Sequence, residues 1–236
     1  MDLSIFEFRK FSQNGEDGIT MKLVELCKKK INKFCVEFGA ENGIECNTRI
    51  LKEDMDWDNV WLDCNYSIPE KKLYKEYLNK DNVVEIFESY NIPINFGCLS
   101  IDIDYNDFYL LGKILKKYKP SIIVCEYNAT HLPNEDKVVK YVDRINNDNS
   151  NYFGASLLSL TKLCNLEGYS LVYSEKRGIN AFYIRDEDFD LSLFKNLNNV
   201  ESLYNTPKYG NGPNGGHRQD SLNREYVYFE EAITKI

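Results

Sequence analysis

Short apolar runs, many of them rich in β-branched residues, alternate with longer amphipathic stretches along most of this chain. This alternation is typical of βαβ units, in which helices join parallel strands. Apolar residues at helical spacing predict helices over 18–30, 106–118 and 155–166. The continuous apolar runs predict seven buried strands, over 34–38, 60–63, 83–87, 98–103, 121–126, 170–173 and 181–184.

The last two predicted strands are separated only by a short turn region, which predicts an antiparallel hairpin. We therefore expect an α/β fold that is Rossmann-like: a mostly parallel seven-stranded sheet with a C-terminal antiparallel hairpin and helices on both faces. A length of 236 residues and a hydrophobic content of 43% fit a single domain with a buried core.

Within that single domain, 1–236, we expect an N-terminal helical cap segment at 1–33 and a ligand-binding core at 34–185. Residues 186–236 form a C-terminal extension and a candidate substrate lid. Its Gly-, Pro- and Asn-rich stretch 205–219 predicts a loop that is either flexible or ordered over a ligand. Residues 220–236 return as a predicted helix.

Charge and composition limit the classes of partner. With 29 basic against 37 acidic side chains, the formal net charge is −8, which disfavours nucleic acid as a ligand. No apolar run approaches the roughly 18 residues of a membrane span. The N-terminus lacks the features of a signal peptide. Seven scattered cysteines without a CxxC pair indicate reduced thiols, so we expect a cytoplasmic protein.

Polar residues follow the first predicted strands, where ligands bind in such sheets. Gly39 and Gly43 follow the first strand, and their spacing is not the GxGxxG that cradles a pyrophosphate. Asp63 ends the second strand, where a carboxylate can accept hydrogen bonds from ribose hydroxyls. After the third predicted strand, Glu88 or Ser89 would lie near an adenine. Together these features favour S-adenosylmethionine (SAM), a nucleoside without phosphates.

Several blocks of sequence, spread over about residues 10–185, resemble the FkbM-type class I SAM-dependent methyltransferases. They are 11–18 (FSQNGEDG), 36–40 (VEFGA), 47–48 (NT), 100–107 (SIDIDYND), 126–129 (EYNA), 154–156 (GAS) and 178–182 (GINAF). The resemblance implies methyl transfer from SAM to oxygen on a small polar acceptor: a sugar, a sugar nucleotide or a phosphorylated precursor in surface glycan or capsule biosynthesis. It implies cofactor contacts at Gln13, Glu16, Glu37, Gly39, Asn42, Asn47 and Asp63, to which we add Asp102.

Acidic and amide side chains follow the fourth and fifth predicted strands, and three interpretations of them stay open. Asp104, Glu126 and Asn128 offer the oxygen ligands that Mg²⁺ or another divalent cation prefers. Alternatively, Asp104 is a metal-free general base. Finally, these carboxylates cap helices, bind the SAM ammonium group or are solvated, and Asp107 in particular is typical of a helix start.

The two histidines and a few basic residues add candidates for contact with the acceptor. His131, shortly after the fifth predicted strand, is a second candidate general base. His217 forms part of a candidate anion-binding lid with Lys208 and Arg218, the alternative being a flexible loop. Arg144 and Arg185 are either anion contacts or members of surface salt bridges.

Two other functions remain compatible with the sequence. One is an NAD-type, nucleotide-dependent sugar-modifying enzyme, against which the missing GxGxxG counts. The other is a non-catalytic SAM-binding module. The sequence leaves the formation of a homo-oligomer open.

Overall fold

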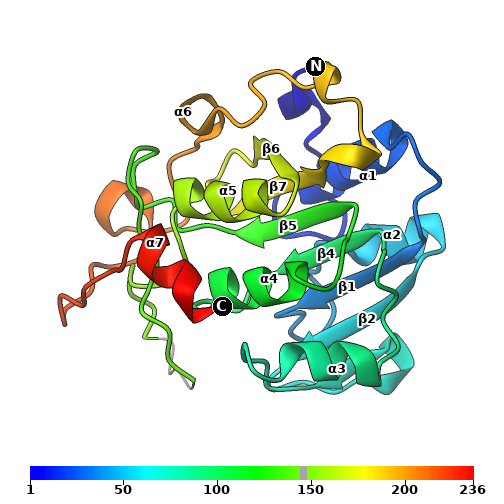
Figure 1. Cartoon of the computed structure of the whole chain (residues 1–236), viewed down its shortest axis with the longest axis horizontal. Helices are drawn as coiled ribbons and strands as arrows, with labels where there is room; N and C mark the ends of the chain where they lie inside the picture. Colours follow the sequence, from blue (N-terminus) through cyan, green and yellow to red (C-terminus); the bar gives the residue numbers. More distant parts are fainter. Residues whose placement is uncertain (144–147) are drawn as a thin grey trace.

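The computed structural model describes residues 1–143 and 148–236, so that Arg144 lies outside the described residues. A seven-stranded sheet in the order β3-β2-β1-β4-β5-β7-β6 runs through the molecule (Figure 1). The first five strands pair in parallel, and β7 pairs antiparallel with both β5 and β6. The strands are β1 (Phe34–Phe38), β2 (Asp58–Asp63), β3 (Leu73–Lys75), β4 (Cys98–Ile101), β5 (Ile122–Glu126), β6 (Tyr169–Ser174) and β7 (Asn180–Arg185).

This topology confirms the predicted fold class. A mostly parallel sheet that ends in an antiparallel hairpin, with helices on both faces, is the Rossmann-like α/β architecture that the sequence led us to expect. The carboxyl ends of β1 to β5 lie along one edge of the sheet because these strands are parallel. Residues from distant parts of the chain therefore meet along that edge.

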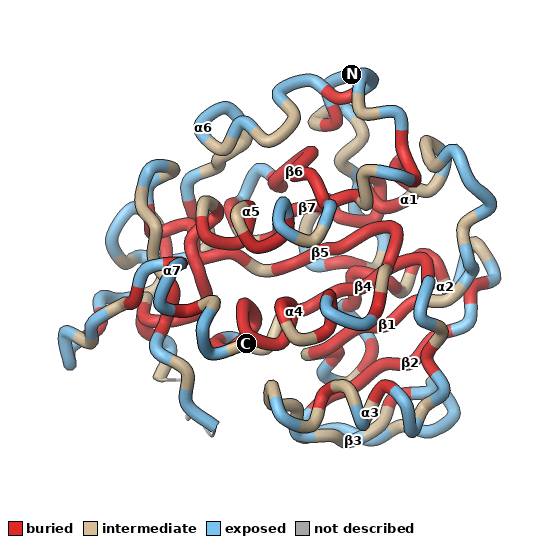
Figure 2. Tube along the Cα trace, in the orientation of Figure 1, coloured by how far each residue is buried: buried red, intermediate tan, exposed pale blue. Residues whose placement is uncertain are grey.

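Helices cover the two faces because successive strand residues point to opposite sides. In β5, Ile123 and Cys125 join a core with residues of α3, α4 and α5, whereas Ile122 and Val124 join a core with α1 and α2. Figure 2 shows the central strands as the most continuously buried part of the chain. The helices are α1 (Glu16–Leu26), α2 (Arg49–Met55), α3 (Val83–Ser89), α4 (Asp107–Leu115), α5 (Leu157–Leu166), α6 (Val200–Leu203) and α7 (Phe229–Ala232).

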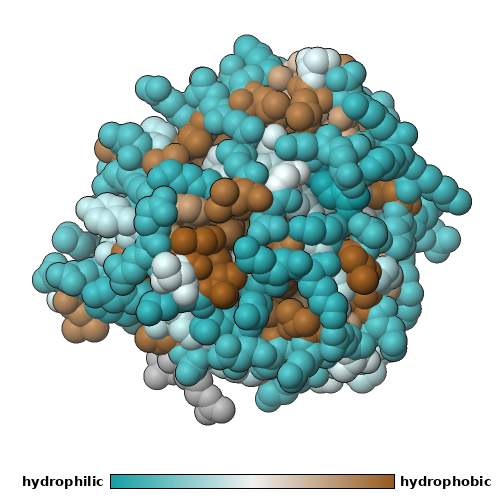
Figure 3. Space-filling view, viewed as in Figure 1, coloured by the Kyte–Doolittle hydropathy of each residue, from teal (hydrophilic) through white to brown (hydrophobic). Residues whose placement is uncertain are grey.

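The face seen in Figure 3 carries mostly hydrophilic side chains, with hydrophobic patches between them. Among the described residues, no helix combines the length and apolar character needed to cross a membrane. All seven cysteines are free, as the reduced thiols predicted from the sequence require.

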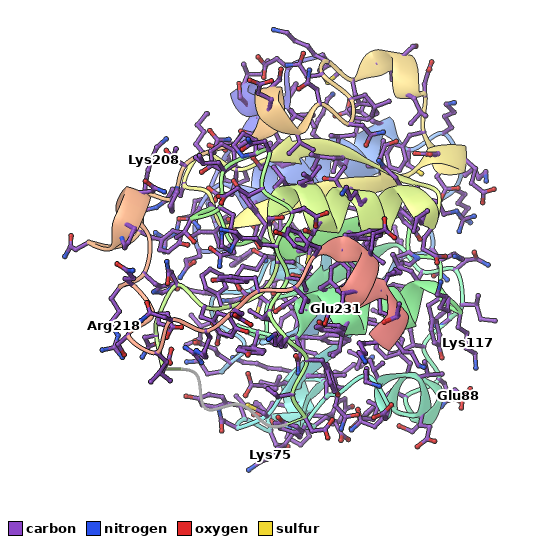
Figure 4. All side chains as sticks on the ribbon, turned by 60° about the vertical axis from the view of Figure 1, so that its left-hand side comes forward. Lys75, Glu88, Lys117, Lys208, Arg218 and Glu231 are labelled. Carbon is purple, nitrogen blue, oxygen red and sulfur yellow. The ribbon has the colours of Figure 1, made fainter. Side chains whose placement is uncertain are left out.

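The predicted third strand is wrong, because residues 83–87 form most of α3. Val83 and Phe87 stand four residues apart and are both fully buried in one core, as helical spacing requires. The edge strand is instead the three-residue β3. Glu88 and Ser89, expected near an adenine because they would follow a strand, instead end α3, and the Glu88 carboxylate pairs with Lys117 (Figure 4).

The C-terminal extension contains less helix than predicted. Residues 220–236 form only the four-residue α7 and a 3₁₀ turn, Ile233–Lys235. The stretch 205–219 is a loop with a short 3₁₀ turn, Pro213–Gly215, coloured orange in Figure 1, on the side of the sheet where β5 ends. The division of the chain into cap, core and extension stays a prediction.

Candidate active site

A cavity of about 1140 Å³ lies along the carboxyl ends of β1 to β5. This volume exceeds that of most small-molecule sites and has room for a nucleoside and a second small molecule. The N-terminal loop, the β6–β7 turn and the C-terminal loop complete its wall. Of the residues predicted to act here, those in the wall are Gln13, Gly39, Asp63, Asp102, Asp104, Glu126 and His217.

Gly39 marks the point where three strand ends converge. Its φ of +71° favours glycine, and a Cβ atom here would lie 1.7 Å from the carbonyl oxygen of Asp102. Its amide donates to the carbonyl oxygen of Leu62 at 3.1 Å. The loop after β1 can therefore pack against the ends of β2 and β4 only because residue 39 has no side chain.

Asp63 shapes the cavity wall between two loops. Its Oδ2 accepts a hydrogen bond from the amide of Glu41 at 2.9 Å, and its Oδ1 accepts from the amides of Asn65 and Tyr66 at 2.7 and 3.1 Å. A carboxylate oxygen can accept two hydrogen bonds, so Oδ2 keeps capacity for a ligand hydroxyl. Asn42, by contrast, lies outside the wall and its Oδ1 accepts from the amide of Ile44.

Glu37 and Asn47 are buried and do not line the cavity. The Glu37 carboxylate accepts from the amides of Asn47 and Thr48 at 2.7 and 2.9 Å and from the Thr48 hydroxyl at 2.6 Å. Burial raises the pKa of Glu37 to about 7, while these hydrogen bonds act in the opposite direction. Asn47 donates in turn to Ser100. This network ties β1 to the start of α2 and to β4.

The N-terminal loop is held over the cavity by two buried acids at the start of α1. Asp17 Oδ2 accepts from three consecutive amides, those of residues 10–12, at 2.7 to 2.8 Å. Glu16 accepts from the amide of Asn14 at 2.9 Å and from the Asn180 side chain at 3.0 Å. Glu16 thus positions the loop without lining the cavity, whereas Gln13 reaches the wall.

Four carboxyl groups crowd the ends of β4 and β5. One oxygen each from Asp102, Asp104 and Glu126 lies within 4.8 Å of the others. Burial, and then repulsion between these acids, raises the pKa of Asp102 and Glu126 well above the usual range, and burial raises that of Asp107 to about 6. Such crowding opposes folding, which favours a role in ligand chemistry for this acidic cluster.

Asn128 and His131 do not reach the cavity wall. The Asn128 amide group donates to the carbonyl oxygens of Asn151 and Phe153 at 2.8 and 2.9 Å. His131 is buried with its ring 4.5 Å from that of Tyr226, and burial lowers its pKa to about 4. Among the acidic residues described, the oxygen cluster consists of Asp102, Asp104 and Glu126, and Asn128 stays a predicted ligand outside the cavity wall.

The predicted basic lid is only partly at the cavity. His217 lines it, but Lys208 and Arg218 donate to the carbonyl oxygens of Lys176 and Asp148 and do not line it (Figure 4). Arg185 forms a salt bridge with Asp188 at 3.4 Å, which agrees with the second of the two roles expected for it.

Seven acids and two arginines line the cavity, so the field inside it is negative. Several residues that line the cavity were not predicted from the sequence. Glu76 was missed because the strand before it was misplaced. Arg9, Arg177 and Tyr209 were missed because no sequence pattern places them here. The charged lining residues are Glu41, Glu45, Asp63, Glu76, Asp102, Asp104, Glu126, Arg9 and Arg177.

The turn between β6 and β7 gives a prediction about stability. Buried Glu175 accepts from the amides of Arg177 and Ile179 at 2.6 and 2.5 Å, and burial raises its pKa to about 7. From pH 4.5 to 7 the folded protein keeps a proton that the unfolded chain releases, so stability falls as pH rises through this window. We expect the free energy of unfolding of the unaltered protein to fall over this range. For the Glu175→Gln variant, this fall should be smaller by up to about 3 kcal/mol.

Urea unfolding between pH 4.5 and 8 measures this difference. Exposed Glu187 provides the matched control, and Glu187→Gln should follow the unaltered protein. Parallel curves for all three proteins would show that Glu175 does not titrate in this range.

No protein-family model and no curated protein matches this sequence. Among solved structures, the chain is similar to a protein from Klebsiella pneumoniae assigned as an O-methyltransferase, with a TM-score of 0.41 and 13% identity over 76% of this chain and 82% of that one. It is also similar to an O-methyltransferase from Bacillus cereus in complex with SAH, with a TM-score of 0.40 and 13% identity over 72% and 78%. Similarity at this level does not identify an activity for this chain.

Proposed function

We propose that this protein is a SAM-dependent methyltransferase that methylates an oxygen atom of a small polar acceptor. The observation that carries the proposal is a cavity with seven acids and two arginines at the carboxyl ends of a methyltransferase-type sheet. SAM carries an ammonium and a sulfonium cation against a single carboxylate, and no phosphate. A dinucleotide such as NAD would place two phosphates in the same negative field, which disfavours the nucleotide-dependent alternative.

The donor end of the cavity lies over β1, β2 and β3. Gly39 lets the backbone approach the cofactor, and Asp63 Oδ2 offers an acceptor to a ribose hydroxyl. Glu76, which follows β3, takes the adenine-side position expected of Glu88. Gln13 closes this end from the N-terminal loop.

The acidic cluster forms the reacting end. An acceptor oxygen attacks the methyl carbon of SAM, the carbon–sulfur bond breaks in line, and neutral S-adenosylhomocysteine (SAH) leaves. The hydroxyl proton passes to a carboxylate, and a raised pKa makes Asp102 or Glu126 a stronger base than an ordinary acid. Asp104, the exposed member, faces the incoming acceptor. We assign the proton acceptor to this cluster because His131 lies outside the cavity wall.

A divalent cation fits the same cluster. Three carboxylates offer hard oxygen ligands, and a buried oxygen of Glu126 has no hydrogen-bond partner within the described residues. When bound, Mg²⁺ would relieve the repulsion among the acids and favour the ionised acceptor oxygen.

The metal requirement can be tested by turnover after dialysis against EDTA. We expect methyl transfer to fall at least tenfold and to recover when Mg²⁺ is added. Full activity in excess chelator would reject the metal and leave the cluster as a metal-free base.

Cofactor binding can be tested without knowing the acceptor. Cys64 is the exposed cysteine and lines the donor end, whereas Cys27 is half-buried and lies elsewhere. We expect saturating SAH to slow alkylation of Cys64 by iodoacetamide at least fivefold and to leave Cys27 unchanged, because ligand covers the thiol. Peptide mass spectrometry measures both sites.

Isothermal titration completes this test. SAM and SAH should bind, and NAD should not. No heat from SAH together with unchanged alkylation of Cys64 would overturn the proposed function.

The finer assignments are also proposals. The sequence blocks support an FkbM-type enzyme acting in the cytoplasm on a precursor of a surface glycan. The negative cavity favours an uncharged sugar over a phosphorylated one unless a cation is bound. A screen of labelled methyl transfer across glycan precursors tests this, and SAM binding with no transfer to any of them would favour the non-catalytic binding module.

A further inference from the structure

We propose that Tyr209, on the C-terminal loop, binds the acceptor and that its phenol and the Glu126 carboxylate together hold one hydroxyl of an uncharged polyol such as a sugar. This inference rests on the proposed function and names the substrate class of the same cavity. Nothing in the sequence patterns pointed to Tyr209.

Two oxygen atoms at the reacting end are buried without a hydrogen bond. Within the described residues, the Tyr209 hydroxyl and Glu126 Oε2 have no partner, and both residues line the cavity. Leaving such a group unsatisfied costs about 1–3 kcal/mol, so these positions are expected to be matched by a ligand or by water. A sugar hydroxyl satisfies both at once, because it accepts from the phenol and donates to the carboxylate.

The donor role of Tyr209 follows from its surroundings. Burial and the nearby negative charges of Glu126 and Asp102 raise the pKa of the phenol well above its usual value. A tyrosine phenol is protonated at neutral pH even at its ordinary pKa of about 10, so Tyr209 has an O–H to donate to a ligand oxygen.

The loop fixes the phenol before any ligand arrives. The amides of Tyr209 and Gly210 both donate to the carbonyl oxygen of Gly215, at 3.1 and 2.9 Å. The Lys208 amide donates to the carbonyl oxygen of Arg177, on the β6–β7 turn, at 2.8 Å. These hydrogen bonds join the two ends of the loop and attach it to the turn between β6 and β7. Binding of the acceptor therefore does not have to order the loop.

The ring of Tyr209 is supported from behind. Its centroid lies 5.1 Å from that of His217, which in turn lies 5.5 Å from that of Phe153. His217, predicted to bind anions, therefore packs between two aromatic rings at this position. Its packing adds to the rigidity of the phenol.

The charges around the phenol exclude an anionic group. Asp102 and Glu126 line the same cavity as Tyr209, and the guanidinium of Arg177 donates to the carbonyl oxygen of Lys208 at 2.8 Å. A phosphate placed here would be repelled by two acids, whereas a neutral hydroxyl is not.

The test uses the full chain saturated with SAH and measures ligand binding by titration. The probes are methyl α-glucopyranoside, methyl α-mannopyranoside, methyl α-galactopyranoside and glucose 6-phosphate. We compare the unaltered protein with Tyr209→Phe, which keeps the ring and removes the hydroxyl, and with Tyr228→Phe, a matched control at an exposed tyrosine outside the cavity.

We expect at least one glycoside to bind, glucose 6-phosphate to bind more weakly, and Tyr209→Phe to weaken the best glycoside about tenfold with SAH affinity unchanged. Tyr228→Phe should bind as the unaltered protein does. Equal glycoside affinity in Tyr209→Phe, tighter binding of glucose 6-phosphate, or no binding of any glycoside would overturn the inference while leaving SAH binding intact. Loss of SAH binding by the unaltered protein would instead overturn the proposed function.

Discussion

Replacing Gly39 with alanine is expected to abolish SAM binding and to lower the free energy of unfolding by about 3 kcal/mol or more. The new Cβ would stand 1.7 Å from the carbonyl oxygen of Asp102, and backbone cannot yield as a flexible side chain does. The loop after β1 would have to move away from β4, which separates the donor end of the cavity from the reacting end. Titration with SAM and urea unfolding measure the two effects.

Gly168 provides the matched control for this variant. It also has a positive φ, +81°, but a Cβ there would meet nothing within 4 Å. Gly168→Ala should therefore cost only the conformational penalty, about 1 kcal/mol, and bind SAM normally. If both variants lose the same stability and keep SAM binding, the close approach at Gly39 is not what builds the site.

Replacing Glu126 with glutamine is expected to slow methyl transfer at least about 100-fold while SAM affinity stays the same. The variant loses one of the two carboxylates proposed to take the acceptor proton, and glutamine is a much weaker base and metal ligand. Because it also removes one member of a repelling buried cluster, the free energy of unfolding should stay equal or rise. Labelled methyl transfer to the acceptor found by screening measures the rate.

Glu45 is the control for Glu126, since it is also an acid in the cavity wall but pairs with Arg9 and is half-exposed. Glu45→Gln should change the rate less than about twofold. A Glu126→Gln protein that is active at the normal rate would remove the carboxylate from the mechanism, and one that is unfolded would assign it a structural role.

Much of the sheet could be predicted because its central strands are buried on both faces. Such strands appear as continuous apolar runs, which is how residues 34–38 and 121–126 were located. Residues 83–87 have the same local character but bury Val83 and Phe87 on one helix face, and a five-residue run cannot distinguish the two patterns. The true edge strand, β3, is too short to give a signal.

The sequence predicted the residues of the candidate site only where the end of a strand determines the position of the residue that follows it. The acids after β4 and β5 meet because parallel strands end at one edge, so Asp104 and Glu126 were found together. Which way a polar side chain turns depends on the backbone groups left unpaired nearby. Asn128 turns to two carbonyl oxygens and Glu37 to two amides, and neither choice is encoded in spacing.

The C-terminal loop begins and ends at nearly the same place, since a Cβ on Gly216 would lie 3.3 Å from the Pro207 ring. A loop whose two ends lie close together tolerates changes in its length and sequence, because a longer or shorter loop can join the same two ends without moving the sheet. Changes in residues 208–215 would then alter the wall of the cavity around Tyr209, while the half that contains Gly39 and Asp63 keeps its geometry.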